Sequence, residues 1–205
     1  MFVYSAVGGI CGIAASGPDA GTVLWSSTAW NKSVVAPSPV CMPDGKIFLT
    51  AGYGAGSMVL QLESSGSNFT VRMIDQYLPL EGLASEQQTP LYFKGHLIGI
   101  EPKDAGALRN QMICVNPVNC RVPVWSSGPE ARFGLGPYLI ADNKLFILND
   151  DGVLTIVKPD IKKYIQIDQI KLFDGQDAWA PIAVADGYMV LRDSKRMIGI
   201  KLAVD

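Results

Sequence analysis

Short apolar runs separated by turn residues fill the chain, and they recur in one order. A proline follows a small or polar residue, an apolar run follows the proline, and a turn leads into a second apolar run. This pattern occurs four times, around Pro39, Pro90, Pro137 and Pro181. Successive prolines are 51, 47 and 44 residues apart. A period of about 40 to 50 residues, with several short strands in each repeat, is typical of a β-propeller.

Each repeat continues past its first pair of apolar runs. Two more short runs rich in β-branched and aromatic residues follow, and turn signals such as Asp44-Gly45 and Asp151-Gly152 separate them. These further runs are 57–62, 69–74, 112–115, 122–125, 153–157 and 164–167. A repeat therefore holds about four strands, the content of one blade. No apolar stripe with the helical period extends over a helical length, so the sequence predicts an all-β fold.

The two ends of the chain carry incomplete repeats. Residues 2–5, 9–14 and 22–25 fit the second, third and fourth strands of a blade, and 196–202 fit a third strand with no fourth. We therefore expect a single domain, 1–205, that is a partial β-propeller of four to five blade equivalents. An open arc leaves strand edges unpaired, so we expect part of a larger ring or a protomer that closes by self-association. The expected blades are approximately 1–30, 31–80, 81–128, 129–172 and 173–205.

The composition suits stacked sheets that are buried on both faces. Hydrophobic residues make up 48% of the 205 residues, charged residues only 18%, and the mean hydropathy is +0.21. The net charge of −2 provides no basic field for nucleic acid. No apolar stretch has the length and density of a membrane span. The uncharged start of the chain is interpreted as a strand pair and not as a signal remnant, because no basic residue precedes Lys32.

The cysteines and the single histidine offer little for a metal site. No two of the four cysteines form a C-x-x-C pair, and His96 has no orienting partner that the sequence reveals. We therefore predict neither a metal site nor a catalytic residue. Cys114 and Cys120 flank a short turn-like segment, and two alternatives stay open. They could face each other across a turn, or both could be small buried residues, which is the interpretation we favour.

Two segments that end in tryptophan carry a family resemblance. They are Asp19-Ala20-Gly21-Thr22-Val23-Leu24-Trp25 and Cys120-Arg121-Val122-Pro123-Val124-Trp125. They resemble the D-x-x-G-x-x-x-W docking motif of the PQQ-like, or quinoprotein-like, propeller repeats, and 136–202 is similar to that family. The resemblance implies blade-docking roles for Trp25 and Trp125 and a periplasmic or secreted location. Quinoprotein alcohol dehydrogenases also carry adjacent cysteines and a calcium held by Glu, Asn and Asp, and this chain has no adjacent cysteines.

Up-and-down strand order predicts that two sets of loops meet at one mouth of the channel. One set precedes the first strand of each repeat, and the other joins the second and third strands. Aromatic side chains among paired charges suit a planar polar ligand, and Arg can hold a carboxylate through two hydrogen bonds. The alternative is ordinary solvated loops over packed tryptophans. The candidate ligand-binding residues are Trp30, Lys32, Tyr53, Glu86, Glu101, Arg132, Asp177, Trp179, Arg192 and Asp193, with Phe133 in the same loops.

Two loops contain part of a phosphate or calcium motif. The segment 52–56 is glycine-rich but lacks the Lys-Ser/Thr pair of a P-loop, and a strand follows it. The segment 149–152 offers oxygen ligands but lacks the spacing and final Glu of an EF-hand. We therefore predict that both are hairpin turns.

The sequence favours a non-catalytic propeller that acts as a binding or scaffold module without a cofactor. Its partner would be a protein, a peptide or a carbohydrate at the channel mouth. The alternative, which the family resemblance implies, is part of a PQQ-dependent alcohol or sugar dehydrogenase with calcium. In that case Trp179 or Trp30 would stack on the quinone, and Asp177 and Asp193 would be the acidic candidates for metal or base.

Overall fold

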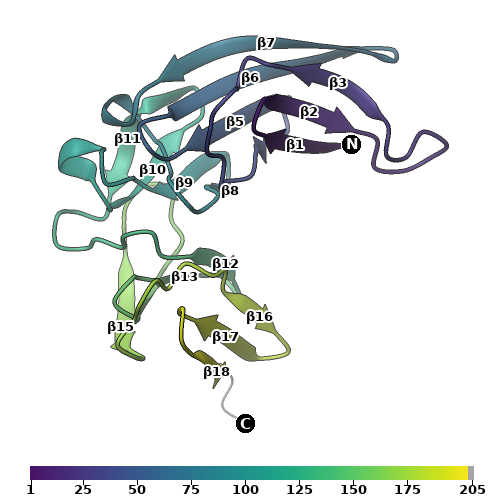
Figure 1. The fold of residues 1–205 in the computed structure, drawn as a ribbon. Coiled ribbons are helices and arrows are strands. Elements are labelled where there is room, and N and C mark those ends of the chain that lie inside the picture. Colours follow the sequence, from purple (N-terminus) through teal and green to yellow (C-terminus); the bar gives the residue numbers. More distant parts are fainter. Residues whose placement is uncertain (203–205) are drawn as a thin grey trace.

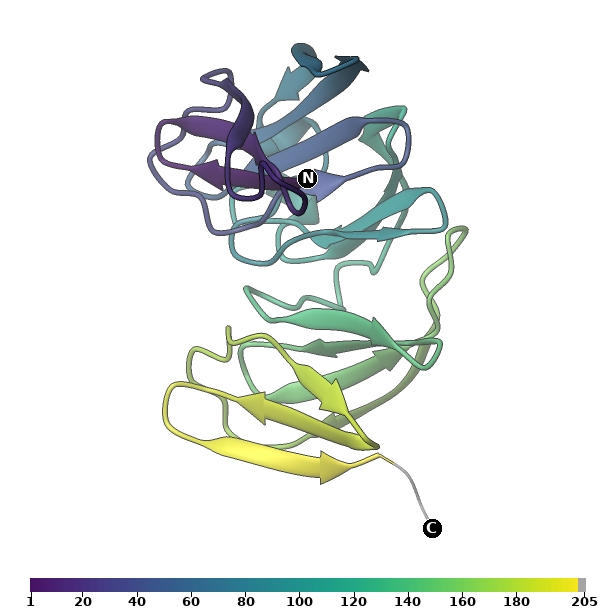
Figure 2. The same ribbon diagram turned by 90° about the vertical axis from the view of Figure 1, so that its right-hand side faces the viewer.

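Five antiparallel β-sheets follow one another around an open, C-shaped arc, with the two termini on different sheets (Figure 1). The computed structural model describes residues 1–202. Within each sheet the strands pair in chain order, which is the order of a propeller blade. Figure 2 shows the gap between the first and last sheets, and the described residues form no closed ring. The chain is thus all-β and forms a partial β-propeller.

The strands define five blades. Blade 1 contains β1 (Phe2–Ala6), β2 (Gly9–Ile13) and β3 (Val23–Ser27). Blade 2 contains β4 (Val40–Cys41), β5 (Lys46–Ala51), β6 (Gly56–Ser65) and β7 (Asn68–Tyr77). Blade 3 contains β8 (Leu91–Phe93), β9 (His96–Ile100), β10 (Met112–Asn116) and β11 (Asn119–Ser126). Blade 4 contains β12 (Tyr138–Ala141), β13 (Lys144–Leu148), β14 (Val153–Val157) and β15 (Gln166–Lys171). Blade 5 contains β16 (Ala183–Ala185), β17 (Tyr188–Arg192) and β18 (Met197–Lys201). Two short 3-10 turns, η1 (Pro79–Glu81) and η2 (Gly106–Leu108), are the only helical elements of the described residues. No helix in this part of the chain is long and apolar enough to cross a membrane.

Tight turns with positive φ join the first two strands of the blades. Asp142 and Asn143 have φ of 46° and 52°, and Asp186 and Gly187 have φ of 49° and 77°. Two successive residues of this kind make a turn whose twist matches that of the flanking strands. Asp, Asn and Gly tolerate this backbone region best, which is why these residues mark the hairpins in the sequence.

Four apolar clusters form the core, one at each contact between neighbouring blades. They join Ile10 and Trp25 to Leu49 (blades 1 and 2), Phe48 to Leu97 (blades 2 and 3), Ile98 and Trp125 to Leu145 (blades 3 and 4), and Phe146 to Met189 and Leu191 (blades 4 and 5). Alternate residues of one strand serve two clusters, because successive side chains point to opposite faces of a sheet. In this way both faces of the central strands are buried.

Polar contacts also link blades 2 and 3. The guanidinium group of Arg121 on β11 donates to both carboxylate oxygens of Asp75 on β7, at 2.8 and 3.2 Å, and lies 4.9 Å from the centre of the Tyr77 ring. The hydrogen bond from Arg121 holds the pKa of Asp75 below its ordinary value. Near the arc centre, the backbone N–H of Ser38 donates to the Thr89 hydroxyl at 2.8 Å. The residues that precede two successive repeat prolines are therefore in contact.

The strands expected from the sequence differ from the observed ones mainly at their ends. The run 164–167 was expected to be a strand, whereas β15 begins at Gln166. Tyr164 packs against Trp125, with ring centres 5.9 Å apart, and so belongs to the blade contact. The first strand of blade 2 is only two residues long, Val40–Cys41.

Cys114 and Cys120 are buried free thiols on opposite faces of blade 3. Cys114 lies in the cluster shared with blade 4, and Cys120 lies in the cluster shared with blade 2. Burial raises the pKa of Cys114 to about 12 and that of Cys120 to about 11. The interpretation as two small buried residues is confirmed, and the alternative that they face each other across a turn is wrong.

Candidate functional site

Two sets of loops meet on one side of the arc, as the strand order requires. We call the loops before the first strand of a blade the inter-blade loops, and those between the second and third strands the central turns. The inter-blade loops are 28–39, 78–90, 127–137 and 172–182, and the central turns are 52–55, 101–111, 149–152 and 193–196. Direct contacts join the two sets: the Ser194 N–H donates to the Gln176 carbonyl at 2.9 Å, and the Leu135 N–H donates to the Asp150 carboxylate at 3.2 Å.

Side chains at the start of two central turns fix the turn backbone. The Asn149 Oδ1 accepts a hydrogen bond from the Asp151 N–H at 3.0 Å. The Asp193 Oδ1 accepts from the N–H groups of Lys195 and Arg196 at 2.8 and 2.7 Å. These backbone donors, led by Lys195, hold the pKa of Asp193 below its ordinary value. Asp193 is 3% exposed, so it supports the turn and is not open to a ligand.

Gln88 links the inter-blade loops of three blades. Its side-chain amide Nε2 donates to the Leu135 carbonyl at 3.3 Å and to the Trp179 carbonyl at 2.9 Å. These three residues precede the first strands of blades 3, 4 and 5. The loops around the arc centre are therefore held together by one side chain. Gln88 belongs to one of the loops that the strand order predicts at the channel mouth. No local feature of the sequence indicates that its side chain bridges loops so distant in the chain.

Trp179 is the candidate residue best placed to meet a ligand. Its side chain is 38% exposed. The Trp179 backbone N–H donates to the Asp177 carbonyl at 2.9 Å, and Asp177 has φ of 51°. Burial raises the pKa of Asp150 above its ordinary value, although the Leu135 N–H and Trp179 oppose the shift. The backbone of Trp179 is thus fixed within its loop, while part of the side chain faces solvent.

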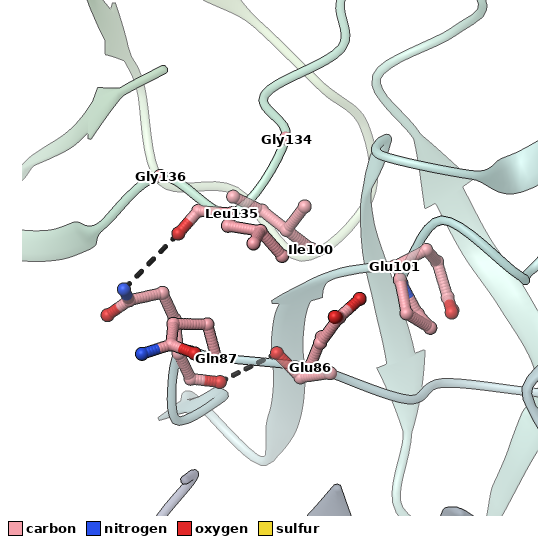
Figure 3. A pocket seen from close by; sticks show the side chains of 10 residues that line it. Glu86, Gln87, Ile100, Glu101, Gly134, Leu135 and Gly136 are labelled. Carbon is pink, nitrogen blue, oxygen red and sulfur yellow. Dashed lines mark hydrogen bonds between the residues drawn. The ribbon is translucent and has the colours of Figure 1, made fainter. Parts of the chain in front are cut away.

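A small cavity lies between blades 3 and 4. Figure 3 shows Glu86 and Glu101 along one part of its wall and Gly134, Leu135 and Gly136 along another. Its volume is about 10 Å³, which is close to the room that one water molecule needs. It is too small for an organic ligand.

Two buried carboxylates line this cavity. Glu101 is 1% exposed; one of its oxygens accepts the Ala84 N–H at 3.3 Å, and the other has no hydrogen-bond partner in the described structure. Burial raises the pKa of Glu101 to about 9, and the nearby Asp104 adds to the shift. Glu101 is therefore protonated at neutral pH. Glu86 is 7% exposed and lies 3.8 Å from the ammonium group of Lys103.

A wider hollow of about 400 Å³ lies beside the central turn of blade 2. Lys32 and the 71% exposed Tyr53 line it, and the Lys103 ammonium lies 5.5 Å from the centre of the Tyr53 ring. Tyr53 has φ of 57°, a strained value for an aromatic residue. Trp30 lies below Lys32, whose ammonium is 5.0 Å from its ring centre. A hollow of this volume is within the usual size of small-molecule sites.

The two candidate arginines lie apart from each other. The Arg132 guanidinium group donates to the carbonyls of Pro129, at 2.9 Å, and Arg109, so its hydrogen-bonding groups are partly used within the loops. Arg192 is exposed at the end of β17 and lines a surface hollow of about 330 Å³ in the central turn of blade 5. No contact joins these two groups in the described structure.

Trp30 and Phe133 are core residues. Trp30 is 0% exposed and belongs to the cluster between blades 1 and 2, and Phe133 is 3% exposed and belongs to the cluster between blades 3 and 4. Burial gives Trp30 a packing role in place of the expected ligand contact. Trp25 and Trp125 are 7% and 8% exposed at blade contacts, and the Trp125 Nε1 donates to the Asp160 carbonyl of blade 4 at 3.0 Å.

Six of the ten candidate residues thus fall into three groups. Glu86 and Glu101 enclose the small cavity, Lys32 and Tyr53 line the hollow on blade 2, and Trp179 lies with Asp177 at the arc centre. Within residues 1–202 no three His, Cys, Asp or Glu side chains are arranged as a metal site.

Comparisons with known proteins show the fold. No family model matches the chain, and no curated protein matches its sequence significantly. BamB from Moraxella catarrhalis is similar in structure, with 14% identity and a TM-score of 0.58 over 98% of this chain and 60% of BamB. Two structures of AztD from Citrobacter koseri, one of them the apo protein, match at 14% and 12% identity with a TM-score of 0.48. They cover 95% and 98% of this chain and 50% and 68% of AztD.

BamB has a β-propeller fold, and the likeness supports the same architecture here. This chain spans about 60% of the length of the BamB chain that it matches.

Proposed function

We propose that this chain is a non-catalytic propeller module of the PQQ-like type that binds a partner at its mouth loops. The observation that carries the proposal is the bridge from Gln88 to the loops of Leu135 and Trp179. A mouth whose loops are already fixed loses little conformational entropy when a ligand binds. The half-exposed indole of Trp179 would be the contact at its centre.

The proposed partner is a peptide or a carbohydrate that stacks an apolar face on Trp179. Indole presents a large rigid surface, and tryptophan is among the residues that contribute most to binding energy at interfaces. Polar loop groups around it would provide hydrogen bonds. The proposal includes an extracytoplasmic location, which the family resemblance implies.

Tryptophan fluorescence tests the proposal directly. Trp25, Trp30 and Trp125 are at most 8% exposed, so Trp179 is the indole that a ligand at the mouth can reach. We would titrate the protein with panels of peptides and oligosaccharides and follow the emission. We expect saturable quenching by at least one probe, and a dissociation constant about tenfold higher or more in Trp179→Ala when measured by calorimetry.

Val118→Ala is the matched control, because Val118 is 84% exposed in the outer turn between β10 and β11. It should bind like the wild type. Absence of binding across both panels, or equal affinity of the Trp179→Ala variant, would contradict the proposal. Pyrroloquinoline quinone with calcium is one further probe. A rise in melting temperature that is specific to this pair would favour the dehydrogenase alternative over the proposed binding module.

A further inference from the structure

Blade 2 lacks a contact that the next three blades make between their own inter-blade loop and central turn. The hydrogen bonds in those blades are Ala84 N–H to the Glu101 carboxylate (3.3 Å), Leu135 N–H to the Asp150 carboxylate (3.2 Å) and Ser194 N–H to the Gln176 carbonyl (2.9 Å). Within residues 1–202 no hydrogen bond joins loop 28–39 to the central turn 52–55. The hollow of about 400 Å³ lies between these two segments.

The sequence of the central turn explains why the hollow stays open. In blades 3 and 4 the acceptor is a carboxylate in the first two residues of the turn, Glu101 or Asp150. Gly52 and Tyr53 hold these two places in blade 2. A Cβ at Gly52 would lie 2.3 Å from the Glu86 Cγ, so no longer side chain fits there. The carboxylate that accepts the loop N–H in two other blades therefore has no counterpart in blade 2.

The inter-blade loop provides hydrogen-bond donors and a positive charge to this hollow. Residues 31–34 line it, and within the described chain their backbone N–H groups make no hydrogen bond. The Lys32 ammonium lies 5.0 Å from the centre of the buried Trp30 ring and forms no ion pair with any described carboxylate. No Asp or Glu lines the hollow. Free donors around an unpaired cation favour an anionic ligand.

Tyr53 adds a flat surface in a fixed position. The turn is closed by the Ala55 N–H, which donates to the Gly52 carbonyl at 3.2 Å, and Tyr53 and Gly54 have φ of 57° and 77°. An aromatic residue in this backbone region is strained, and such strain is concentrated at functional sites. The side chain is 71% exposed, so burial of the tyrosine itself does not account for the strain.

We propose that this hollow binds a small organic carboxylate with a flat apolar body. The carboxylate would pair with Lys32 and accept the N–H groups of 31–34, as Glu101 and Asp150 accept the N–H of the inter-blade loop in blades 3 and 4. The flat body would stack on the Tyr53 ring. The hollow has the volume of a small-molecule site. The inference does not rest on the peptide or carbohydrate site at Trp179.

Heteronuclear NMR with benzoate as the probe tests the site. We expect saturable shifts of the amides of 31–34 and of Tyr53 and Gly54. Benzamide has nearly the same shape without the charge, and acetate has the charge without the ring. Each should bind at least about tenfold more weakly than benzoate. These amides report on the hollow and not on Trp179, so failure here and failure of the mouth site are separate results.

Two variants separate the charge from the ring. Lys32→Gln should weaken benzoate binding at least about tenfold, and Lys32→Arg should restore most of it. Tyr53→Gly should also weaken binding, yet should not lower the melting temperature, because glycine tolerates a positive φ. The matched control is Lys94→Gln, since the Lys94 ammonium also lies 5.0 Å from an aromatic ring, that of Phe93. It should bind benzoate like the wild type.

Three results would each overturn the proposal. They are benzoate shifts that do not saturate or that spare the amides of 31–34, equal affinity for benzoate and benzamide, and unchanged benzoate affinity in Lys32→Gln. Circular dichroism checks the folding of the variants. The comparison of benzoate with benzamide uses the wild type alone, so it decides even if a variant unfolds.

Discussion

At the scale of single residues, Glu101 shows how the ring of blades sets side-chain chemistry. It follows β9 directly, and in the sequence it looks like one more charged residue in a solvated loop. In the folded chain Glu101 is buried and lines the same small cavity as Gly134 to Gly136 of the inter-blade loop of blade 4. Contacts between loops so far apart leave no local signal, so the sequence identified the loop but not the burial of its carboxyl group.

Glu101 makes stability depend on pH. Its pKa rises from the ordinary 4.5 to about 9 on folding, so across this window the folded state keeps a proton that the unfolded state has lost. The free energy of unfolding should therefore fall as pH rises from about 5 to 9, by up to about 1.4 kcal/mol per pH unit from this group. Glu101→Gln has no such proton, and its profile should lack this decline.

Urea unfolding at several pH values between 5 and 9 measures the effect. The exposed Glu130→Gln variant serves as the control and should follow the wild type. Parallel profiles of wild type and Glu101→Gln would mean that Glu101 titrates at an ordinary pKa in the folded state.

At the scale of elements, the positions of the strands follow from the pattern of apolar residues and from the turn residues between them. Close contact between some strands also requires glycine. The apolar runs and the Asp-Gly turn signals predicted the hairpins because both are local properties. The length of β4 and the start of β15 depend on packing against other blades, so local pattern could not predict them. Gly136 lies one residue before a repeat proline. The sequence pattern described this position only as small or polar, whereas the structure requires a glycine there.

Gly136 should not tolerate a side chain. A Cβ at this position would lie 1.8 Å from the Leu148 carbonyl oxygen, which is backbone of the neighbouring strand and cannot rotate away. We expect Gly136→Ala to lower the free energy of unfolding by about 2 kcal/mol or more. The matched control is Gly199→Ala in β18, where a Cβ would meet no atom within 4 Å. Chemical denaturation of both variants measures the effect. Equal free energies of unfolding for the two variants would show that the inner hairpin of blade 4 can shift at low cost.

At the scale of the whole molecule, the five blades form a linear series in which each apolar core cluster joins two blades that follow each other in the sequence. Stability in such arrays is approximately a sum of the stabilities of the units and of their nearest-neighbour contacts. Blades 2, 3 and 4 have an apolar contact on both faces, whereas blades 1 and 5 have one on a single face. The repeat period predicted the series of blades, but the unequal burial of the end blades follows from the arc.

Native-state hydrogen exchange should reveal this difference between blades. We expect the amides of β9 and β13 to be the slowest to exchange, because their strands are paired on both edges and buried on both faces. Amides on the free edges of β1 and β18 should exchange orders of magnitude faster. Uniform protection along the arc would instead mean that the five blades unfold as one cooperative unit.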